Sequence, residues 1–236
     1  EKIGRLVCGM RDAGHKIWFH TDAIQAAGKV PIDVEAIGCD LLSISAHKIY
    51  SPKGSGALYV RRGTRLHAQN IGGRQERGLR AGTEPVANIV ALGEASAMAK
   101  SEIQAVGAKL REMRDRFESR VSEAIPEIVI NGIEAERVPN VSNISFDGIE
   151  GEGLLINLDM NGIAVSTGSA CSSGSIEPSR VIKALGREDS LARGAIRFSF
   201  GKFNTDDELD YVLEILPAAV ENLRKLNAAK TSTARK

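Results

Sequence analysis

The sequence predicts an α/β protein, and the order of its apolar segments is the main reason. Segments 16–22 and 40–46 have the composition of buried strands, and a short helical pattern at 31–38 separates them. A turn rich in glycine and proline then leads to a further strand at 56–60. Strands that alternate with helices are typical of a sheet with parallel members. We therefore expect the first part of the chain to form an α/β domain.

Composition and charge narrow the classes of function. The chain has 236 residues, of which 42% are hydrophobic and 26% are charged, so it can form a sizeable core. Lys and Arg number 31 against 30 Asp and Glu, which argues against direct nucleic-acid binding. No apolar run approaches the ~18 residues of a membrane helix, and the N-terminus lacks the apolar core of a secretory signal. We expect a cytoplasmic protein without a membrane partner.

The three cysteines are Cys8, Cys39 and Cys171. Their odd number and wide spacing do not suit a disulfide framework, and neither a CxxC motif nor a nearby histidine pair indicates a metal site. Cys8 and Cys39 lie in a helical and a pre-strand context, so we expect both to be buried as small hydrophobic residues.

The first 14 residues show the pattern of an amphipathic helix. Ile3, Leu6, Val7 and Met10 share one side, and Gly14 suits the end of the helix. Neither a capping signal nor an initiating methionine precedes this pattern. We expect that the chain begins in the middle of a domain.

A long connection and a long helix follow the third strand. Residues 61–84 are rich in glycine and arginine, and ordered loops of this length are usually functional or lie at an interface. After Pro85, which suits the first turn of a helix, a helical pattern continues to about residue 124. Its length suggests a bridge between two domains, which we place at 1–100 and 101–236.

The second part of the chain predicts further strands and helices. We expect strands at 126–130, 141–146, 163–166 and 195–200, and helices at 150–161 and 178–185. The small residues of 167–175 cannot pack a core and predict a mobile loop. A capping box, Thr205-Asp206-Asp207-Glu208, opens the last helix, and we expect the tail after Leu226 to be disordered.

Lys48 is the centre of the functional hypothesis. It follows the strand at 40–46 within Ser45-Ala46-His47-Lys48, and the Gly-rich turn of residues 51–56 comes next. A lysine at a strand end, beside a hydroxyl and an imidazole, suits a Schiff base with pyridoxal phosphate (PLP). The alternative is an ordinary surface lysine.

PLP chemistry also needs an acid at the pyridine nitrogen and donors for the phosphate. Asp22 ends the strand at 16–22 and suits the acid, with Gln25 one turn further able to reach the ring hydroxyl. The alternative role of Asp22 is to cap the turn that follows it. Ser45 and His47 suit the role of hydrogen-bond donors to the phosphate. The alternative is that both are solvated polar residues at a strand end.

Five motifs in register resemble those of the NifS/IscS-like cysteine desulfurases. This family belongs to the class V aminotransferase group of fold-type I PLP enzymes, and the resemblance covers nearly the whole chain. The motifs are His20-Thr21-Asp22-Ala23-x-Gln25, Ser45-Ala46-His47-Lys48 with Pro52-Lys53-Gly54, Gly78-Leu79-Arg80-x-Gly82-Thr83-Glu84, Ser169-Ala170-Cys171-Ser172-Ser173-Gly174, and Arg197-Phe198-Ser199-Phe200-Gly201. The resemblance implies part of the large fold-type I domain, with a mostly parallel sheet, followed by a smaller α+β C-terminal domain.

The resemblance implies a role for each cofactor residue. Lys48 would be the catalytic Schiff-base lysine, Asp22 would bind the pyridine nitrogen and Gln25 the phenolic oxygen. Ser45 and His47 would hold the phosphate, and His47 also counts among the catalytic residues.

Three further residues complete the implied site. Thr83 would reach the phosphate of the other subunit, which implies a homodimer. Arg197 would pair with the substrate α-carboxylate, although a surface arginine on a strand is the alternative. Cys171 would take sulfur from PLP-bound L-cysteine as a persulfide, and a flexible loop suits its delivery to an acceptor.

The form of the cysteine loop resembles the branch that serves iron–sulfur cluster assembly or tRNA thiolation, so we expect a scaffold or tRNA-thiolation protein as the sulfur acceptor. The family also carries an upstream Gly/Thr phosphate turn, a histidine that stacks on PLP and an asparagine near the ring hydroxyl, which this chain lacks. The chain therefore resembles the C-terminal part of such an enzyme. We expect it to bind PLP weakly and to catalyse poorly by itself.

Other functions remain open from the sequence alone. A different class V PLP aminotransferase or a selenocysteine lyase would need no cysteine in the loop. The chain could also be a catalytically silent module whose long helix and Gly/Arg loop serve only dimerisation. A nucleotide loop at residues 51–56 is a weaker alternative, because the segment lacks the GxxxxGK[ST] spacing.

Overall fold

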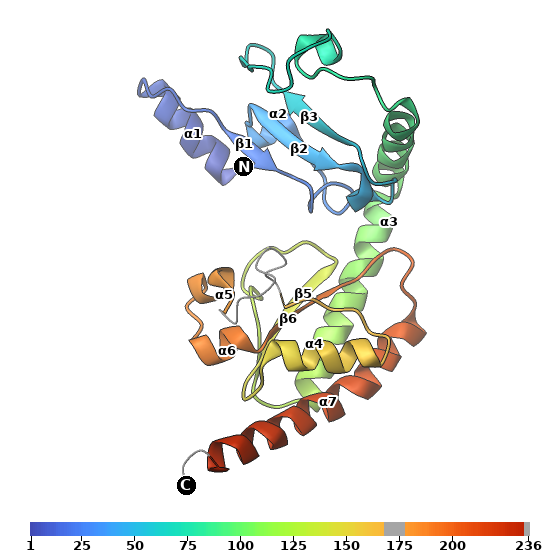
Figure 1. Ribbon diagram of the computed structural model, residues 1–236. Helices are drawn as coiled ribbons and strands as arrows, with labels where there is room; N and C mark the ends of the chain where they lie inside the picture. Colours follow the sequence, from blue (N-terminus) through green and yellow to red (C-terminus); the bar gives the residue numbers. More distant parts are fainter. Residues whose placement is uncertain (168–177, 234–236) are drawn as a thin grey trace. The chain divides into compact units, whose positions relative to one another are not determined.

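The computed structural model describes residues 1–167 and 178–233. The chain divides into two compact units, Glu1–Ala105 and Val106–Lys236. The helix α3 (Val86–Ala124) contributes its first half to one unit and its second half to the other (Figure 1). Its bounds confirm the predicted long helix. The further assignment of these units to a large and a small domain stays a prediction.

The first unit contains a three-stranded sheet of order β1-β2-β3. Strand β1 (His20–Asp22) pairs in parallel with β2 (Leu41–Ser45), whereas β3 (Gly56–Val60) pairs antiparallel with β2. The antiparallel pairing follows from the short connection after β2, which is too short for a crossover. That connection contains the 3₁₀ helix η1 (Ala46–Ile49).

The strand expected at 16–22 is shorter than predicted, because side chains occupy the backbone groups of its first half. The backbone N–H of Phe19 donates to the Asp40 carboxylate at 2.7 Å, and the Ile17 carbonyl accepts from Arg11 at 2.9 and 3.0 Å. Arg11 also forms an ion pair with Asp40, which is buried. These contacts bring α1 (Lys2–Asp12) to the entry of the sheet.

Helix α1 lies against α2 (Val34–Ile37) through a close backbone approach. A Cβ atom on Gly4 would lie 1.8 Å from the carbonyl oxygen of Ile37, so only glycine fits there. The expectation for Cys39 is confirmed, since it is fully buried. The expectation for Cys8 is wrong: it is exposed, with Sγ 4.0 Å from Asp12 Oδ2 on the next turn.

The loop between β3 and α3 is irregular, as predicted, apart from the short 3₁₀ helix η2 (Glu76–Gly78). Its two arms are tied together, since the backbone N–H of Ala81 donates to the Asn70 carbonyl at 3.1 Å and that of Gly82 to Gln75 Oε1 at 3.2 Å.

The second unit has an antiparallel sheet of order β4-β5-β6. Its strands are β4 (Ile128–Ile130), β5 (Val141–Phe146) and β6 (Ala195–Ser199). The strand expected at 163–166 is reduced to one bridge, between Ser166 and Arg197. The reason is that the backbone N–H of Ile163 donates to the Leu158 carbonyl and closes the preceding helix.

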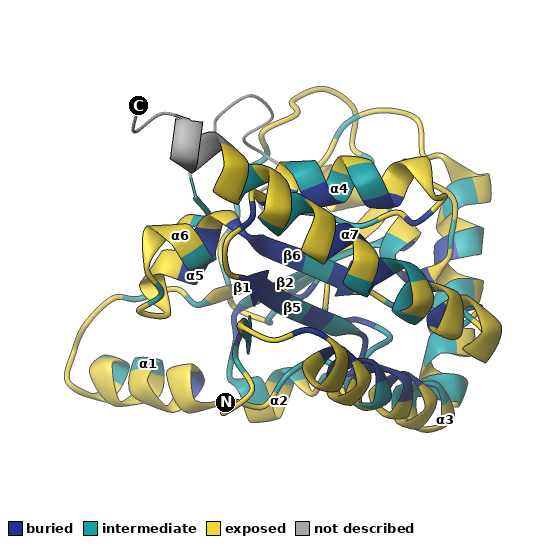
Figure 2. Cartoon of the chain, turned by 90° about the horizontal axis from the view of Figure 1, so that it is seen from below, coloured by how far each residue is buried: buried dark blue, intermediate teal, exposed yellow. Residues whose placement is uncertain are grey.

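One face of this sheet forms the core of the second unit. Ile144 and Phe146 of β5 and Ile196 of β6 are fully buried, and much of both strands is dark blue in Figure 2. Phe117 of α3 packs on Phe198 with ring centroids 4.7 Å apart. Among the described residues of this unit, the helices besides α3 are α4 (Gly151–Met160), α5 (Arg180–Ala184), α6 (Asp189–Arg193) and α7 (Asp206–Thr233).

The predicted capping box of α7 is confirmed, whereas the prediction of a disordered tail after Leu226 is wrong for the residues up to Thr233. The backbone N–H of Glu208 donates to Thr205 Oγ1 at 3.2 Å, and that of Thr205 donates to the Glu208 carboxylate at 3.1 Å. At the other end the helix continues to Thr233. Arg224 donates to the carbonyl of Asp147 at 2.9 Å, and the Asn227 amide donates to that of Gly148 at 3.0 Å, so side chains hold this part of the helix against the unit.

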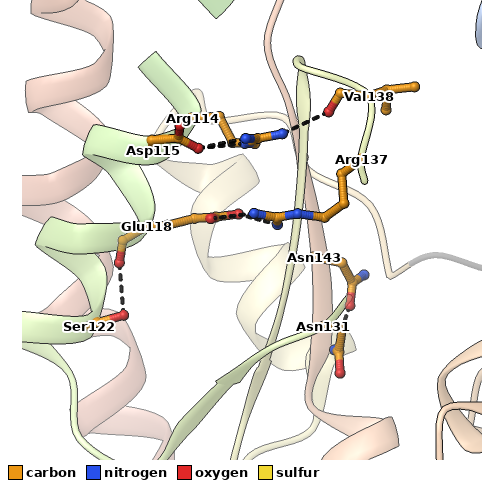
Figure 3. A network of polar contacts seen from close by, with 8 residues as sticks. All are labelled: Arg114, Asp115, Glu118, Ser122, Asn131, Arg137, Val138 and Asn143. Atoms are coloured by element: carbon orange, nitrogen blue, oxygen red, sulfur yellow. Dashed lines mark hydrogen bonds and ion pairs between the residues drawn. The ribbon is translucent and has the colours of Figure 1, made fainter. Parts of the chain in front are cut away.

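A buried ion pair links α3 to the segment before β5. Glu118 accepts two hydrogen bonds from Arg137, at 2.7 and 2.9 Å (Figure 3). This carboxylate raises the pKa of the Arg137 guanidinium. Both side chains are largely removed from solvent, so each charge depends on the other to offset the cost of its desolvation.

No helix in the described part of the chain is both long and apolar enough to cross a membrane.

Candidate PLP site

Strands β1 and β2 end at the same edge of the sheet. Most of the cofactor residues predicted from the sequence lie at these strand ends or just after them. Asp22 is the last residue of β1 and lies opposite Ser43 of β2. Ser45 is two residues further along β2 and therefore shares the face of Ser43. Lys48 follows within η1. The carboxyl ends of neighbouring parallel strands are the usual place for ligands in α/β sheets.

Ser45 and His47 form a pair beside this edge. The hydroxyl Oγ of Ser45 lies 2.9 Å from Nδ1 of His47, within hydrogen-bond distance. The imidazole is exposed and keeps its second nitrogen for another partner. A hydroxyl and an imidazole held together in this way can donate to a phosphate.

Lys48 lies in a turn that the backbone fixes on both sides. The backbone N–H of Ala46 donates to the Ser55 carbonyl at 3.1 Å, and that of Ser51 donates to the Ala46 carbonyl at 3.2 Å. Tyr50 ends the turn with a left-handed φ of 67°. Lys48 is half-buried, and its amine has no partner among residues 1–167 and 178–233. A partly buried lysine without an ion pair suits covalent chemistry better than a solvated one.

Asp22 also caps the turn that follows it, which is the alternative role considered from the sequence. Its Oδ1 accepts from the backbone N–H of Ile24 at 2.9 Å and so caps the turn. The carboxylate is nevertheless exposed, and its Oδ2 accepts no hydrogen bond from the residues that the structure describes. Gln25 is exposed on the turn that follows. Capping and ligand binding are therefore compatible.

The remaining predicted residues lie elsewhere in the chain. Thr83 is exposed in the loop before α3. Arg197 lies on β6 in the second unit, half-buried. Its Nε is buried and has no hydrogen-bond partner in the described part of the chain. Cys171 lies outside the described residues.

Sequence reasoning missed the neighbours of Arg197. Asn143 lies opposite it on β5, and Ser166 exchanges two backbone hydrogen bonds with it, at 2.6 and 3.1 Å. The alternation within 141–146 could have found Asn143, because it places that residue on the face opposite the apolar core.

The donor set at the β1–β2 edge fits PLP. Lys48 offers an amine, Asp22 an anion for a protonated ring nitrogen, and Ser45 with His47 donors for a phosphate. The described residues contain no group of His, Cys, Asp and Glu side chains able to hold a metal ion.

Comparison with known proteins gives a family and a fold. The family model for Aminotransferase class-V matches residues 5–212. Cysteine desulfurase IscS of Dictyoglomus turgidum is 47% identical over 216 residues, which cover 92% of this chain and 55% of that protein. The chain thus spans about half the length of that curated relative.

Solved structures agree with this assignment. A NifS-like protein from Rickettsia africae matches with a TM-score of 0.83 at 27% identity, over 93% of this chain and 57% of the other. SspA in complex with cysteine matches with a TM-score of 0.64 at 33% identity, over 87% of this chain and 55% of the other. The fold is therefore that of the NifS-like proteins, which confirms the predicted fold class.

Proposed function

Because the chain belongs to the class-V aminotransferase family, we propose that it is part of a PLP-dependent cysteine desulfurase. The observation that carries the proposal is the grouping of Asp22, Ser45, His47 and Lys48 at one edge of the β1–β2 pair. Relatives named cysteine desulfurase support the choice of reaction within the family.

Each residue at this edge has a task that suits its surroundings. Lys48 would carry the cofactor, since its amine has no competing partner within the described residues. Asp22 would hold the pyridine nitrogen protonated, and the exposed Gln25 would reach the phenolic oxygen. Ser45 and His47 would bind the phosphate. When bound, PLP supplies an electron sink that weakens bonds next to the substrate's amino-bearing carbon.

The proposed reaction moves one sulfur atom. The Cys171 thiolate attacks the sulfur of L-cysteine, the carbon–sulfur bond breaks, and a carbon–hydrogen bond replaces it to give L-alanine. Cys171 keeps the sulfur as a persulfide, so no outside oxidant or reductant is needed. Arg197 would bind the α-carboxylate of the amino acid, because a guanidinium with an unpaired Nε suits a planar anion.

The proposal includes partners. A homodimer would let the exposed Thr83 contribute to the other subunit's phosphate site. The persulfide would pass to an acceptor protein, either an iron–sulfur scaffold or a tRNA-thiolation protein. The structure of SspA with cysteine, a protein 33% identical to this chain, supports L-cysteine as the substrate.

The test follows the sulfur atom. The chain is incubated with PLP and ³⁵S-labelled L-cysteine, alkylated, and mapped by mass spectrometry with and without dithiothreitol. We expect slow formation of reducible label on Cys171, with L-alanine in equal amount, and neither product with Lys48→Ala. Cys171→Ser should remove the protein-bound label. Label that persists in Lys48→Ala, or that appears only on Cys8, would contradict the proposal.

A further inference from the structure

A row of polar side chains crosses the sheet of the second unit on the face opposite its core. The row contains Asn131, Asn143, Arg197 and Ser166, each next to the one before. The backbone N–H of Asn131 donates to the Asn143 carbonyl at 2.8 Å, Asn143 lies opposite Arg197, and Arg197 forms the bridge with Ser166. Residues directly opposite one another in antiparallel strands point to the same face.

Asn143 and Arg197 form the closer of the two kinds of antiparallel pair. The N–H and C=O of Arg197 both bond to Ser166, so they point away from β5. A pair without mutual backbone hydrogen bonds brings its side chains nearer, with Cα atoms about 4.5 Å apart. The Asn143 amide therefore lies beside the stem of Arg197.

The orientation of the Asn143 amide is fixed from a distance by Arg187. Nε of Arg187 donates to Oδ1 of Asn131 at 3.2 Å. A guanidinium can only donate, so this bond determines which end of the buried Asn131 amide is oxygen. Nδ2 of Asn131 then donates to Oδ1 of Asn143 at 2.7 Å, and the two amides face each other in Figure 3. We call this chain of bonds the Arg187–Asn131–Asn143 relay.

The relay leaves donors, not acceptors, beside Arg197. Oδ1 of Asn143 is used by Asn131, while Nδ2 of Asn143 has no acceptor within residues 1–167 and 178–233. Nε of Arg197 is buried and likewise without a partner there. If the Asn143 amide were reversed, its oxygen would be free to accept from Arg197. A buried donor without an acceptor is costly, so the arrangement favours binding an anion.

We propose that Arg187 and Asn131 are positioning residues that orient Asn143, so that its amide NH₂ joins the Arg197 guanidinium in binding a carboxylate. The ligand class is the α-carboxylate of an amino acid, and in this respect the inference rests on the proposed function. Asn143 would touch the ligand, whereas Arg187 and Asn131 act through it.

The test measures carboxylate binding at Arg197 without the cofactor. The full chain is labelled with ¹⁵N-arginine, the Nε–Hε signal of Arg197 is assigned with Arg197→Lys, and propionate is titrated at constant ionic strength. Loss of one hydrogen bond to a charged ligand weakens binding by about tenfold. We expect Arg187→Met to bind propionate about tenfold more weakly than the unchanged chain. Arg187→Lys restores a donor-only side chain and should bind propionate within about twofold of the unchanged chain.

Two further variants separate orientation from charge. Arg180→Met removes an exposed positive charge from α5 without touching the relay, and should bind propionate like the unchanged chain. Asn131→Asp offers Asn143 only an acceptor, which should reverse its amide and weaken binding by more than tenfold. Thermal unfolding checks that each variant is folded. If Asn131→Asp does not fold, propionate binding by Arg187→Met alone decides whether the relay orients Asn143.

The outcomes separate the relay from the wider proposal. If propionate shifts Arg197 equally in the unchanged chain and in Arg187→Met, the relay is overturned while carboxylate binding by Arg197 is retained. If propionate leaves Arg197 unchanged in the natural sequence, both the relay and the substrate role of Arg197 are overturned. Neither result affects attachment of PLP at Lys48, which is measured separately.

Discussion

Asp22 lies opposite Ser43 in the parallel pairing of β1 with β2, so Asp22 shares a face of the sheet with Ser45. Each of these two strands leads directly into a short segment that contains a proposed cofactor residue, Gln25 after β1 and Lys48 after β2. A short parallel register is therefore enough to bring the proposed acid, Asp22, and the proposed phosphate donor Ser45 to one sheet edge.

Ser45→Ala should weaken PLP binding through the phosphate alone. We expect about a tenfold loss of affinity for PLP, because one hydrogen bond to a charged group is removed. Pyridoxal, which lacks the phosphate, should bind the variant and the unchanged chain alike. Absorbance titration measures both, with the exposed Ser101→Ala on α3 as the control. An equal loss for both ligands would show that Ser45 does not serve the phosphate.

Two glycines of α1 should respond in opposite directions to alanine. A Cβ on Gly4 would meet the Ile37 carbonyl, whereas one on Gly9 has nothing within 4 Å. Gly4→Ala should cost about 1–3 kcal/mol through overpacking, and Gly9→Ala should stabilise α1 by up to about 1 kcal/mol. Hydrogen exchange of the α1 amides measures both. Similar protection in the two variants would contradict the close approach of α1 to α2.

Arg137→Met should destabilise the second unit strongly. It leaves the buried Glu118 carboxylate without its partner, which costs about 3–5 kcal/mol. Lys225→Met removes one member of an exposed ion pair with Glu221 and should cost less than about 1 kcal/mol. Urea denaturation of both variants gives the comparison. Equal free energies of unfolding would mean that the Glu118–Arg137 pair is not buried in solution.

The cap of α7 should make stability depend on acid pH. The side-chain amide of Asn204 and the backbone N–H of Thr205 both donate to Glu208 and lower the pKa of its carboxyl below the ordinary value of 4.5. A lowered pKa in the folded state stabilises the fold above the unfolded pKa, and this contribution is lost as pH falls through the folded pKa.

Glu208→Gln removes that charge while keeping an oxygen acceptor for the cap. The variant should unfold at a lower temperature than the unchanged chain at pH 7, and the difference should shrink as the pH falls below 4.5. Glu214→Gln, elsewhere on α7, is the control. A difference that does not vary with pH would contradict a charged cap.

Local signals in the sequence predicted most elements, and long-range contacts account for the errors. The helix at 86–124 and the Thr205 capping box depend on neighbouring residues, so periodicity and spacing were sufficient. The first half of the segment 16–22 is not strand, because Arg11 and Asp40 occupy its backbone groups. The last helix extends beyond Leu226, and the long-range contacts there are the hydrogen bonds of Arg224 and Asn227 to the carbonyls of Asp147 and Gly148.

The same distinction holds for the site. Their positions at or just after predicted strands suggested Lys48, Asp22 and Ser45 as candidates, and the resemblance to the family gave them roles that stay predictions. The relay to Arg197 depends on which residues lie opposite one another in β4, β5 and β6, and on the position of Arg187. A single sequence does not give the register of strands that are far apart along the chain.

Attachment of PLP to Lys48 is the central claim, and borohydride trapping tests it most directly. The chain is saturated with PLP, reduced with borohydride, digested and mapped by mass spectrometry. A pyridoxyl group on the peptide that contains Lys48 is the expected result, absent in Lys48→Ala and retained in Lys53→Ala, which alters an exposed lysine in the same turn. Equal labelling of Lys29, Lys48 and Lys53, or unchanged total labelling in Lys48→Ala, would contradict the account.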